Sequence, residues 1–223
     1  MTIDLGGEGE GGGPLTASIL QLFAAVTVLS IAPGLAMMVT AFPFMVTVLS
    51  ILRQGLGLQT APPAMLIISL ALFLTYFVME PVLHEVWTRA IAPLSNGEIA
   101  IAEAFARAEP PLRAFMEGRT DPGTIAELAA AAPRATLPAP GEPAPLSLLV
   151  PAFMLSEIAA AFTVGFMLFL PFVIIDLVVA SVLMSMGMMM VPPIVVSLPL
   201  KLAFFVVADG WTLVASALVR GYG

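Results

Sequence analysis

The stretch Asp176-Leu-Val-Val-Ala-Ser-Val-Leu-Met-Ser-Met-Gly-Met-Met-Met-Val-Pro-Pro193 places an acid, a methionine cluster and a double proline in one apolar run. Five methionines lie between Met184 and Met190, with Gly187 among them. Methionine is unbranched and adapts its shape to its neighbours, whereas proline stops a helix. The stretch therefore predicts a helix that ends in a pliable apolar loop, which suits a gate that closes against itself.

The gate hypothesis rests on Met188, Met189 and Met190. Methionines at helical spacing usually fill gaps in a core, so a loosely packed core is the alternative. Three consecutive side chains cannot all face one core, however, and together with Gly187 they describe a loop. An apolar loop near the charged interior of an assembly would form a hydrophobic constriction.

The composition belongs to the membrane class of proteins. Of the 223 residues, 60% are hydrophobic and 10% charged, and the mean hydropathy is +1.05. The uncharged run from Pro14 to Leu52 would be about 57 Å long as one helix, nearly twice the ~30 Å hydrocarbon layer. We therefore expect it to bend at Pro33-Gly34 and Pro43. The net charge of -7 argues against a nucleic-acid partner.

The chemistry-bearing residues are too few for the common enzyme and metal sites. There is no cysteine, and the single histidine, His84, is best read as a surface residue despite its neighbours Glu80 and Glu85. No nucleophile elbow, zinc-protease motif or phosphate-binding loop is present. The sequence predicts no catalytic residues, no metal site and no cofactor.

We predict an all-α fold of four parts: a flexible tail over 1–14, a first helical hairpin over 15–80, a polar helical insert with a proline-rich linker over 81–145, and a second hairpin over 146–223. A weak internal repeat supports the two hairpins. Arg53–Pro63 and Met184–Pro193 each join an incoming helix to a glycine-containing tip, a double proline and an outgoing helix. Chance similarity between apolar segments is the alternative.

The insert contains its own helix signals. Ser95 and Glu98 have the spacing of a capping box, and the helix that follows is expected to be interrupted at Pro110-Pro111. Asp121 before Pro122 predicts a second helix start, running into an alanine-rich stretch. Five prolines between Pro133 and Pro145 predict a stiff, extended linker.

Four ionisable residues lie within the second apolar half: Glu157, Asp176, Lys201 and Asp209. A charge at the centre of a membrane helix costs roughly 2.5 to 3.5 kcal/mol, so such residues pair or face water. We expect inter-subunit ion pairs in which Lys201 meets Glu157 or Asp176. The alternative, strongest for Asp209, is that Glu157 and Asp209 mark helix ends.

Several segments resemble the FliP family of flagellar export-gate proteins and their SctR counterparts in virulence secretion. They are Val48–Gln54, Pro62-Pro63 with Ser69–Thr75, Pro111–Met116, Val150–Phe153 with Ser156-Glu157, Gly165-Phe166, Pro171–Pro193, and Leu198–Lys201 with Asp209–Trp211. The resemblance covers roughly residues 20–219. The run from Pro171 to Pro193 is close to diagnostic.

The resemblance implies a non-enzymatic pore subunit, assembled in several copies with FliQ-like and FliR-like subunits into a helical ring. That ring would form the type III protein export gate in the flagellar basal body of the bacterial inner membrane, with a small extracytoplasmic helical segment. Unfolded export substrates would pass through its lumen. The family's methionine gasket would fall on Met188 to Met190, and its charged positions on Glu157, Asp176 and Lys201.

The sequence departs from the family pattern in places. Ala64-Met65 stands where Asn-Gln is usual, Phe44 where an arginine is usual, and Ala159 where a lysine follows the Ser-Glu pair. These changes bear on how the partners pack.

A second hypothesis, from another class, is a small-ion or solute transporter of two helical hairpins in which Asp176 and Lys201 bind the cargo.

Overall fold

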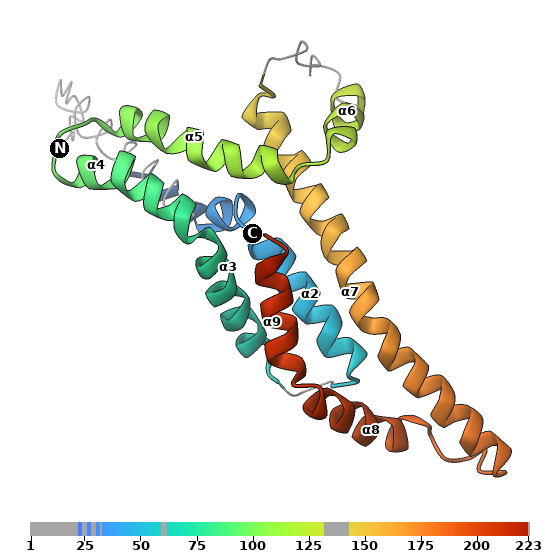
Figure 1. Ribbon diagram of the computed structural model, residues 1–223. Coiled ribbons are helices and arrows are strands. Elements are labelled where there is room, and N and C mark those ends of the chain that lie inside the picture. Colours follow the sequence, from blue (N-terminus) through green and yellow to red (C-terminus); the bar gives the residue numbers. More distant parts are fainter. Residues whose placement is uncertain are drawn as a thin grey trace, which may run out of the picture. The chain divides into compact units, whose positions relative to one another are not determined.

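The computed structural model describes residues 22–23, 26–27, 30–31, 33–58, 62–131 and 143–222, and all regular structure in these ranges is helical (Figure 1). The chain divides into two units, Met1–Met37 and Met38–Gly223. In the first unit, residues 33–37 are helical. The tail predicted for 1–14 and most of the predicted linker, 132–142, lie outside the described residues.

The second unit contains, in its described part, eight α-helices and one π-helix: α2 (Phe42–Gly55), α3 (Ala64–Val86), the π-helix (Trp87–Ile91), α4 (Ala92–Ser95), α5 (Ile101–Arg119), α6 (Pro122–Ala131), α7 (Leu146–Ser185), α8 (Ile194–Val207) and α9 (Gly210–Arg220). Before α2, the chain leaves the helical conformation at residues 39–41, and Pro43 lies in the first turn of the new helix. The all-α prediction and the predicted break near Pro43 are confirmed.

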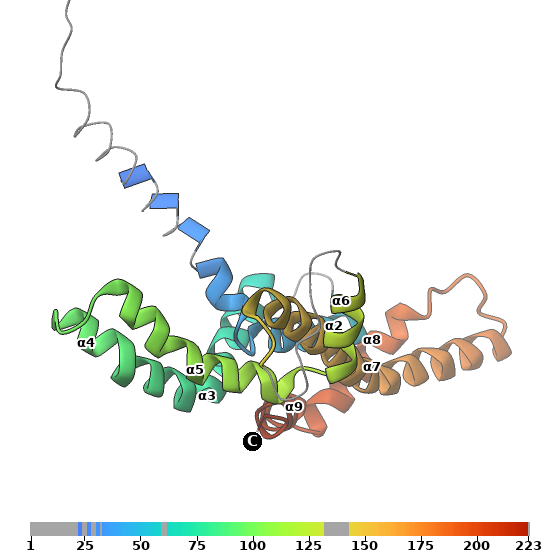
Figure 2. The same cartoon turned by 90° about the horizontal axis from the view of Figure 1, so that it is seen from above.

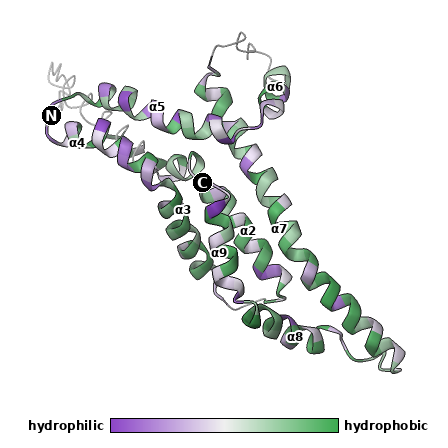
Figure 3. Ribbon diagram, viewed as in Figure 1, coloured by the Kyte–Doolittle hydropathy of each residue, from purple (hydrophilic) through white to green (hydrophobic). Residues whose placement is uncertain are grey.

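Two helical rods are long and apolar enough to cross a membrane. They are Ala64–Ser95, with a mean hydropathy of 2.1 at its most apolar part, and Leu146–Ser185, with 2.6. The pair α8 and α9, bent by 62° at its break, would make a third span if it crosses as one unit. Figure 3 shows the apolar residues concentrated on α7 and α8, with more polar residues on α5. The membrane class read from the composition thus corresponds to two helices of spanning length.

The first rod does not end near Glu80, where the first hairpin was predicted to end. α3 continues through Pro81 to Val86 and joins α4 through the π-helix. The widened turn falls just before Pro93, whose ring would collide with the carbonyl four residues earlier in an α-helix. The rod continues through this turn and Pro93 to Ser95.

The centre of the core is α2, which packs against both α3 and α7 (Figures 1 and 2). Met45, Val48, Leu49 and Leu52 are fully buried, at the helical spacing that places them on one stripe. α7 approaches α2 so closely at Gly165 that an added Cβ would lie 2.5 Å from Ile51 Cδ1. In Figure 2 the distal part of α7 and its loop to α8 extend beyond this packed region.

Both hairpin tips close their incoming helix in the same way. After α2, Gly57 has φ +75°, its N–H donates to Gln54 O and the next N–H donates to Arg53 O. After α7, Gly187 has φ +76° and the same two bonds recur. Its N–H donates to Met184 O, and the N–H of Met188 donates to Leu183 O. This is the Schellman arrangement, which needs a left-handed residue that glycine supplies without a steric cost.

The similarity continues past the tips. In each hairpin a proline pair follows the left-handed glycine at the same distance, and the outgoing helix begins directly after it. Counted from the proline pair, buried side chains occupy the same positions of the two outgoing helices: Ile67, Ala71 and Thr75 on α3, and Ser197, Lys201 and Phe205 on α8. The two hairpins therefore share a repeat of local structure, and its origin as an internal repeat stays a prediction.

The capping box predicted at Ser95 and Glu98 is wrong. Ser95 is the last residue of α4, Gly97 adopts φ +74° after it, and α5 begins only at Ile101. The Glu98 carboxylate accepts a hydrogen bond from Asn96 Nδ2 at 3.0 Å instead of capping a helix. The segment closes one helix rather than opening the next, because the following glycine favours a helix C-terminus.

The interruption predicted at Pro110-Pro111 is also wrong, because both prolines lie inside the continuous helix α5. Ion pairs one turn apart support the helix on both sides, and Pro111 and Met116 are buried. Tertiary packing thus outweighs the local effect of the two prolines.

The predicted helix start at Asp121 is confirmed, since Asp121 Oδ2 accepts the backbone N–H of Thr124 at 2.9 Å.

Two glycine substitutions should change the stability of the protein in opposite directions, because only one of the glycines lies where α2 and α7 approach closely. Gly165→Ala forces its methyl group against Ile51 and should lower the free energy of unfolding by about 1–3 kcal/mol. Gly118→Ala, in an exposed part of α5 with no atom within 4 Å of the new Cβ, should raise it by up to about 1 kcal/mol. Thermal unfolding in one detergent, followed by circular dichroism, measures both; equal stability of the two variants would contradict the packing described.

Candidate functional site

Lys201 connects three helices through one ammonium group. Its side chain, on α8, is 4% exposed, and Nζ donates to Asp176 Oδ2 on α7 at 2.6 Å. The same nitrogen donates to the carbonyl oxygen of Gly55 at 3.0 Å. Gly55 is the last residue of α2, so the tip of the first hairpin is held to both helices of the second.

Two negative groups account for the position of this cation. The last carbonyls of a helix have no partner within the helix and carry the negative end of its dipole. The Gly55 carbonyl and the Asp176 carboxylate therefore both stabilise a charge that apolar helices would otherwise exclude. We call Lys201, Asp176 and Gly55 the lysine brace.

Glu157 forms a separate polar cluster. Its side chain is 1% exposed, and Oε1 accepts a hydrogen bond from Arg119 Nε at 2.9 Å. The Tyr222 hydroxyl donates to the other carboxylate oxygen. Arg119 also donates to Gly221 O at 3.0 Å and lies 4.0 Å from the centre of the Tyr222 ring. Burial raises the pKa of the Tyr222 phenol, and the Glu157 charge raises it further, so the hydroxyl stays a donor.

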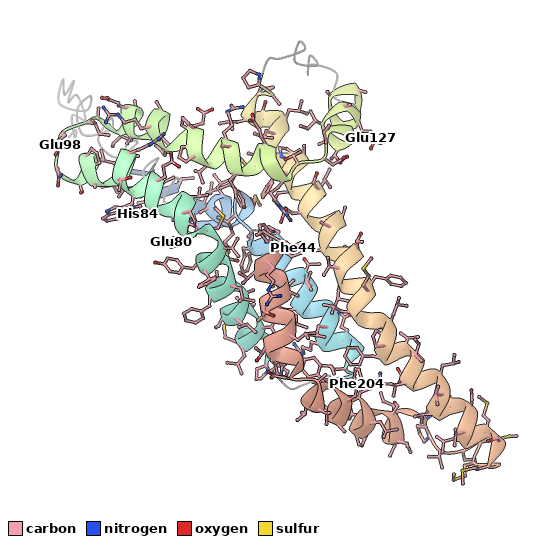
Figure 4. All side chains as sticks on the ribbon, viewed as in Figure 1. Phe44, Glu80, His84, Glu98, Glu127 and Phe204 are labelled. Carbon is pink, nitrogen blue, oxygen red and sulfur yellow. The ribbon has the colours of Figure 1, made fainter. Side chains whose placement is uncertain are left out.

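Aromatic rings surround this cluster. Phe44 of α2 meets Tyr222 edge to face with 5.3 Å between ring centres, and Phe115 of α5 stacks on it at 6.3 Å. Figure 4 labels Phe44 near the start of α2, where these elements meet. The cluster anchors the residues after α9 to α2, α5 and α7. One of its rings comes from Phe44, which stands where the FliP family pattern usually has an arginine.

The structure separates the charges that the sequence had grouped. Lys201 meets Asp176 and not Glu157, and the contact lies within one chain. Glu157 lies inside α7, so the alternative that it marks a helix end is wrong, whereas Asp209 does mark the bend between α8 and α9 with φ 49°. The inter-subunit role of Glu157, Asp176 and Lys201 stays a prediction.

Sequence reasoning missed Arg119 and Tyr222. The ring of Tyr222 contacts Phe44 and its hydroxyl is bonded to Glu157. One signal could have pointed to Arg119, because a glutamate in an apolar helix requires a donor and few cations are available. Arg119 and Glu157 are 38 residues apart, so no local sequence pattern shows that they pair.

The methionine loop lies on the surface of the chain. Met188 is 37% exposed, Met189 82% and Met190 97%. These residues therefore do not fill a core within the chain, and that alternative is wrong for them. Gly187 closes the C-terminal turn after α7 and the proline pair directly precedes α8, so the loop is fixed at both ends while its tip is uncovered.

No group of three or more potential ligands lies close enough to hold a metal ion among the residues that the structure describes. Glu80 and His84 are both exposed, on the side of α3 that faces away from α2 in Figure 4. In the described part of the chain, these two residues line a small surface depression with Tyr76, Leu83 and Trp87 rather than an enclosed site.

The fold and the charge clusters define a class: a helical membrane protein whose ionic groups join its own helices and leave an apolar loop uncovered. The sequence pattern of the FliP family matches residues 25–218. The flagellar biosynthetic protein FliP of Caulobacter vibrioides is 47% identical over 96% of this chain and 80% of its own length. The corresponding proteins of Bacillus subtilis and Aquifex aeolicus are both 44% identical, over 92% and 95% of this chain and 93% and 89% of their own lengths.

The chain belongs to the FliP family. Membership classes it as a component of the flagellar export apparatus and not as an enzyme, and the resemblance read from its motifs is confirmed. Its apolar helices are consistent with a membrane location.

The lysine brace makes a prediction about stability. Lys201→Met leaves the Asp176 carboxylate and the Gly55 carbonyl without their donor and should lower the free energy of unfolding by about 1–3 kcal/mol. Asp176→Asn keeps an oxygen acceptor at 45% exposure and should cost less. Chemical unfolding in a mild detergent compares the two variants; a Lys201→Met protein as stable as the wild type would show that the brace contributes nothing.

Proposed function

We propose that this protein is a pore-forming core subunit of the flagellar type III export gate, and that Met188, Met189 and Met190, held by Gly187, form its seal. Unfolded substrate proteins would pass through a channel made by several copies together with FliQ-like and FliR-like subunits, in the bacterial inner membrane. The single observation that carries the proposal is the exposure of the methionine loop, which is held at one end by α7 and at the other by α8.

The geometry of the loop supports a seal that can yield. The hydrogen bonds around Gly187 and the restricted backbone of Pro192 and Pro193 fix where the loop begins and ends. Between these points the methionine side chains are free to change rotamer, and Met190 is 97% exposed. Flexible apolar side chains can exclude water from a narrow passage and still adapt to different side chains of a moving polypeptide.

Uncovered apolar surface supports assembly into an oligomer. The distal half of α7 exposes large side chains along its length, among them Phe166, Ile174 and Leu177 at 58–66%. Asp176 lies in the same region and remains 45% exposed although it pairs with Lys201. A half-exposed carboxylate on such a surface favours a neighbouring subunit that supplies a polar contact, so the inter-subunit role of Asp176 and Lys201 remains part of the proposal. For Glu157 that role would require an exchange of its present partners.

Replacing Met188, Met189 and Met190 together by alanine should increase leakage of ions through the assembled complex, because shorter side chains leave the constriction open to water. Met167→Ala is the matched control, since Met167 is 64% exposed but lies on α7, away from the loop. Conductance of the purified complex in planar bilayers measures both variants. Conductance equal to that of the wild type in the triple variant would remove the seal from the proposal.

The alternative is a small-ion or solute transporter in which Asp176 and Lys201 hold the cargo. The brace opposes it, because Lys201 is buried and both of its negative partners are protein groups. Native mass measurement in mild detergent separates the two functions. We expect a large hetero-oligomer with two smaller partner subunits, whereas a monomer or homodimer that moves solute would favour the transporter.

A further inference from the structure

An apolar groove runs between α3 and α9, which lie side by side in the second unit (Figure 1). Its volume is about 650 Å³. The walls come from helices whose hydropathy suits a membrane span. Its large apolar residues are Leu70, Leu74 and Phe77 on α3 and Trp211 and Val219 on α9.

One end of this groove carries a positive charge. Arg220, the last residue of α9, lines the groove and is exposed. Within the part of the chain that the structure describes, the other basic side chains are engaged. Arg53 has a contact, and ion pairs are formed by Arg89, Arg107, Arg113, Arg119 and Lys201. Arg220, by contrast, forms no ion pair with any residue that the structure describes.

We propose that the groove between α3 and α9 binds an anionic phospholipid, with an acyl chain along the apolar walls and the phosphate at Arg220. Apolar walls within membrane-class helices favour a hydrocarbon chain, and a basic residue at the end of a groove between such helices favours an acidic headgroup. A free phosphate ion would make no use of the walls. The site is independent of the proposed channel, because it involves neither the methionine loop nor the lysine brace.

The test uses the fluorescence of Trp211, which lies in the groove. Trp87→Phe removes the other of the two tryptophans from the full-length protein. The protein is placed in lipid nanodiscs containing either phosphatidylglycerol or phosphatidylcholine with brominated acyl chains, at equal mole fractions. Bromine quenches tryptophan on contact, so quenching reports which lipid occupies the groove. One arginine near anionic lipid corresponds to a preference of roughly fivefold for phosphatidylglycerol.

Variants of two arginines decide the role of the charge. Arg220→Gln should abolish the preference, Arg220→Lys should retain most of it, and high salt should weaken it. Arg89→Gln is the matched control, because Arg89 forms only an exposed ion pair with Glu85 and does not line the groove. Equal quenching by the two lipids, or a preference that persists in Arg220→Gln, overturns the proposal. So does exclusion of both lipids from Trp211, which a protein helix seated in the groove would produce.

Discussion

The lysine brace constrains the position of both hairpins. Without it, the tip of α2 would end in an unsatisfied carbonyl beside the apolar side chains of α7, and Asp176 would be an isolated acid in an apolar helix. With one ammonium group between them, α2, α7 and α8 are held together at Asp176, before the end of α7, and at Lys201, after the start of α8. The position of the loop relative to the packed region therefore depends on a polar contact, although nearly everything around it is apolar.

The second polar cluster acts at the other end of the packed region. Arg119, Glu157 and Tyr222 join the insert, the first part of α7 and the residues after α9. α9 is thereby fixed at its C-terminal end, while α8 is fixed by Lys201. Between the two, Asp209 occupies a left-handed conformation at the 62° bend, which costs a non-glycine residue roughly 1–2 kcal/mol. That bend is maintained by anchors on both sides of it.

The proposed assembly would give a physical reason for the exposed apolar surface of this protein. Side chains such as Phe166, Leu177 and Met190 are exposed in one chain, and neither the helices nor the loop can bury them by a local change. In the proposed assembly, a membrane would cover some of this surface and neighbouring subunits would cover more. The groove between α3 and α9 differs from the rest because it combines apolar walls with an uncompensated arginine, which is why a lipid suits it better than a purely apolar contact.

The sequence by itself determined the helical membrane class, the repeat of glycine tip and proline pair, the loop at Met188 to Met190, the helix start at Asp121 and the family. These depend on short-range chemistry: hydropathy, the backbone freedom of Gly57 and Gly187, and the restricted backbone of proline. Only the tertiary structure decided which charges pair, that α5 runs through two prolines, and that Ser95 closes a helix. Those outcomes depend on contacts between residues far apart in the chain, such as Arg119 with Glu157 and Lys201 with Gly55, which no local pattern encodes.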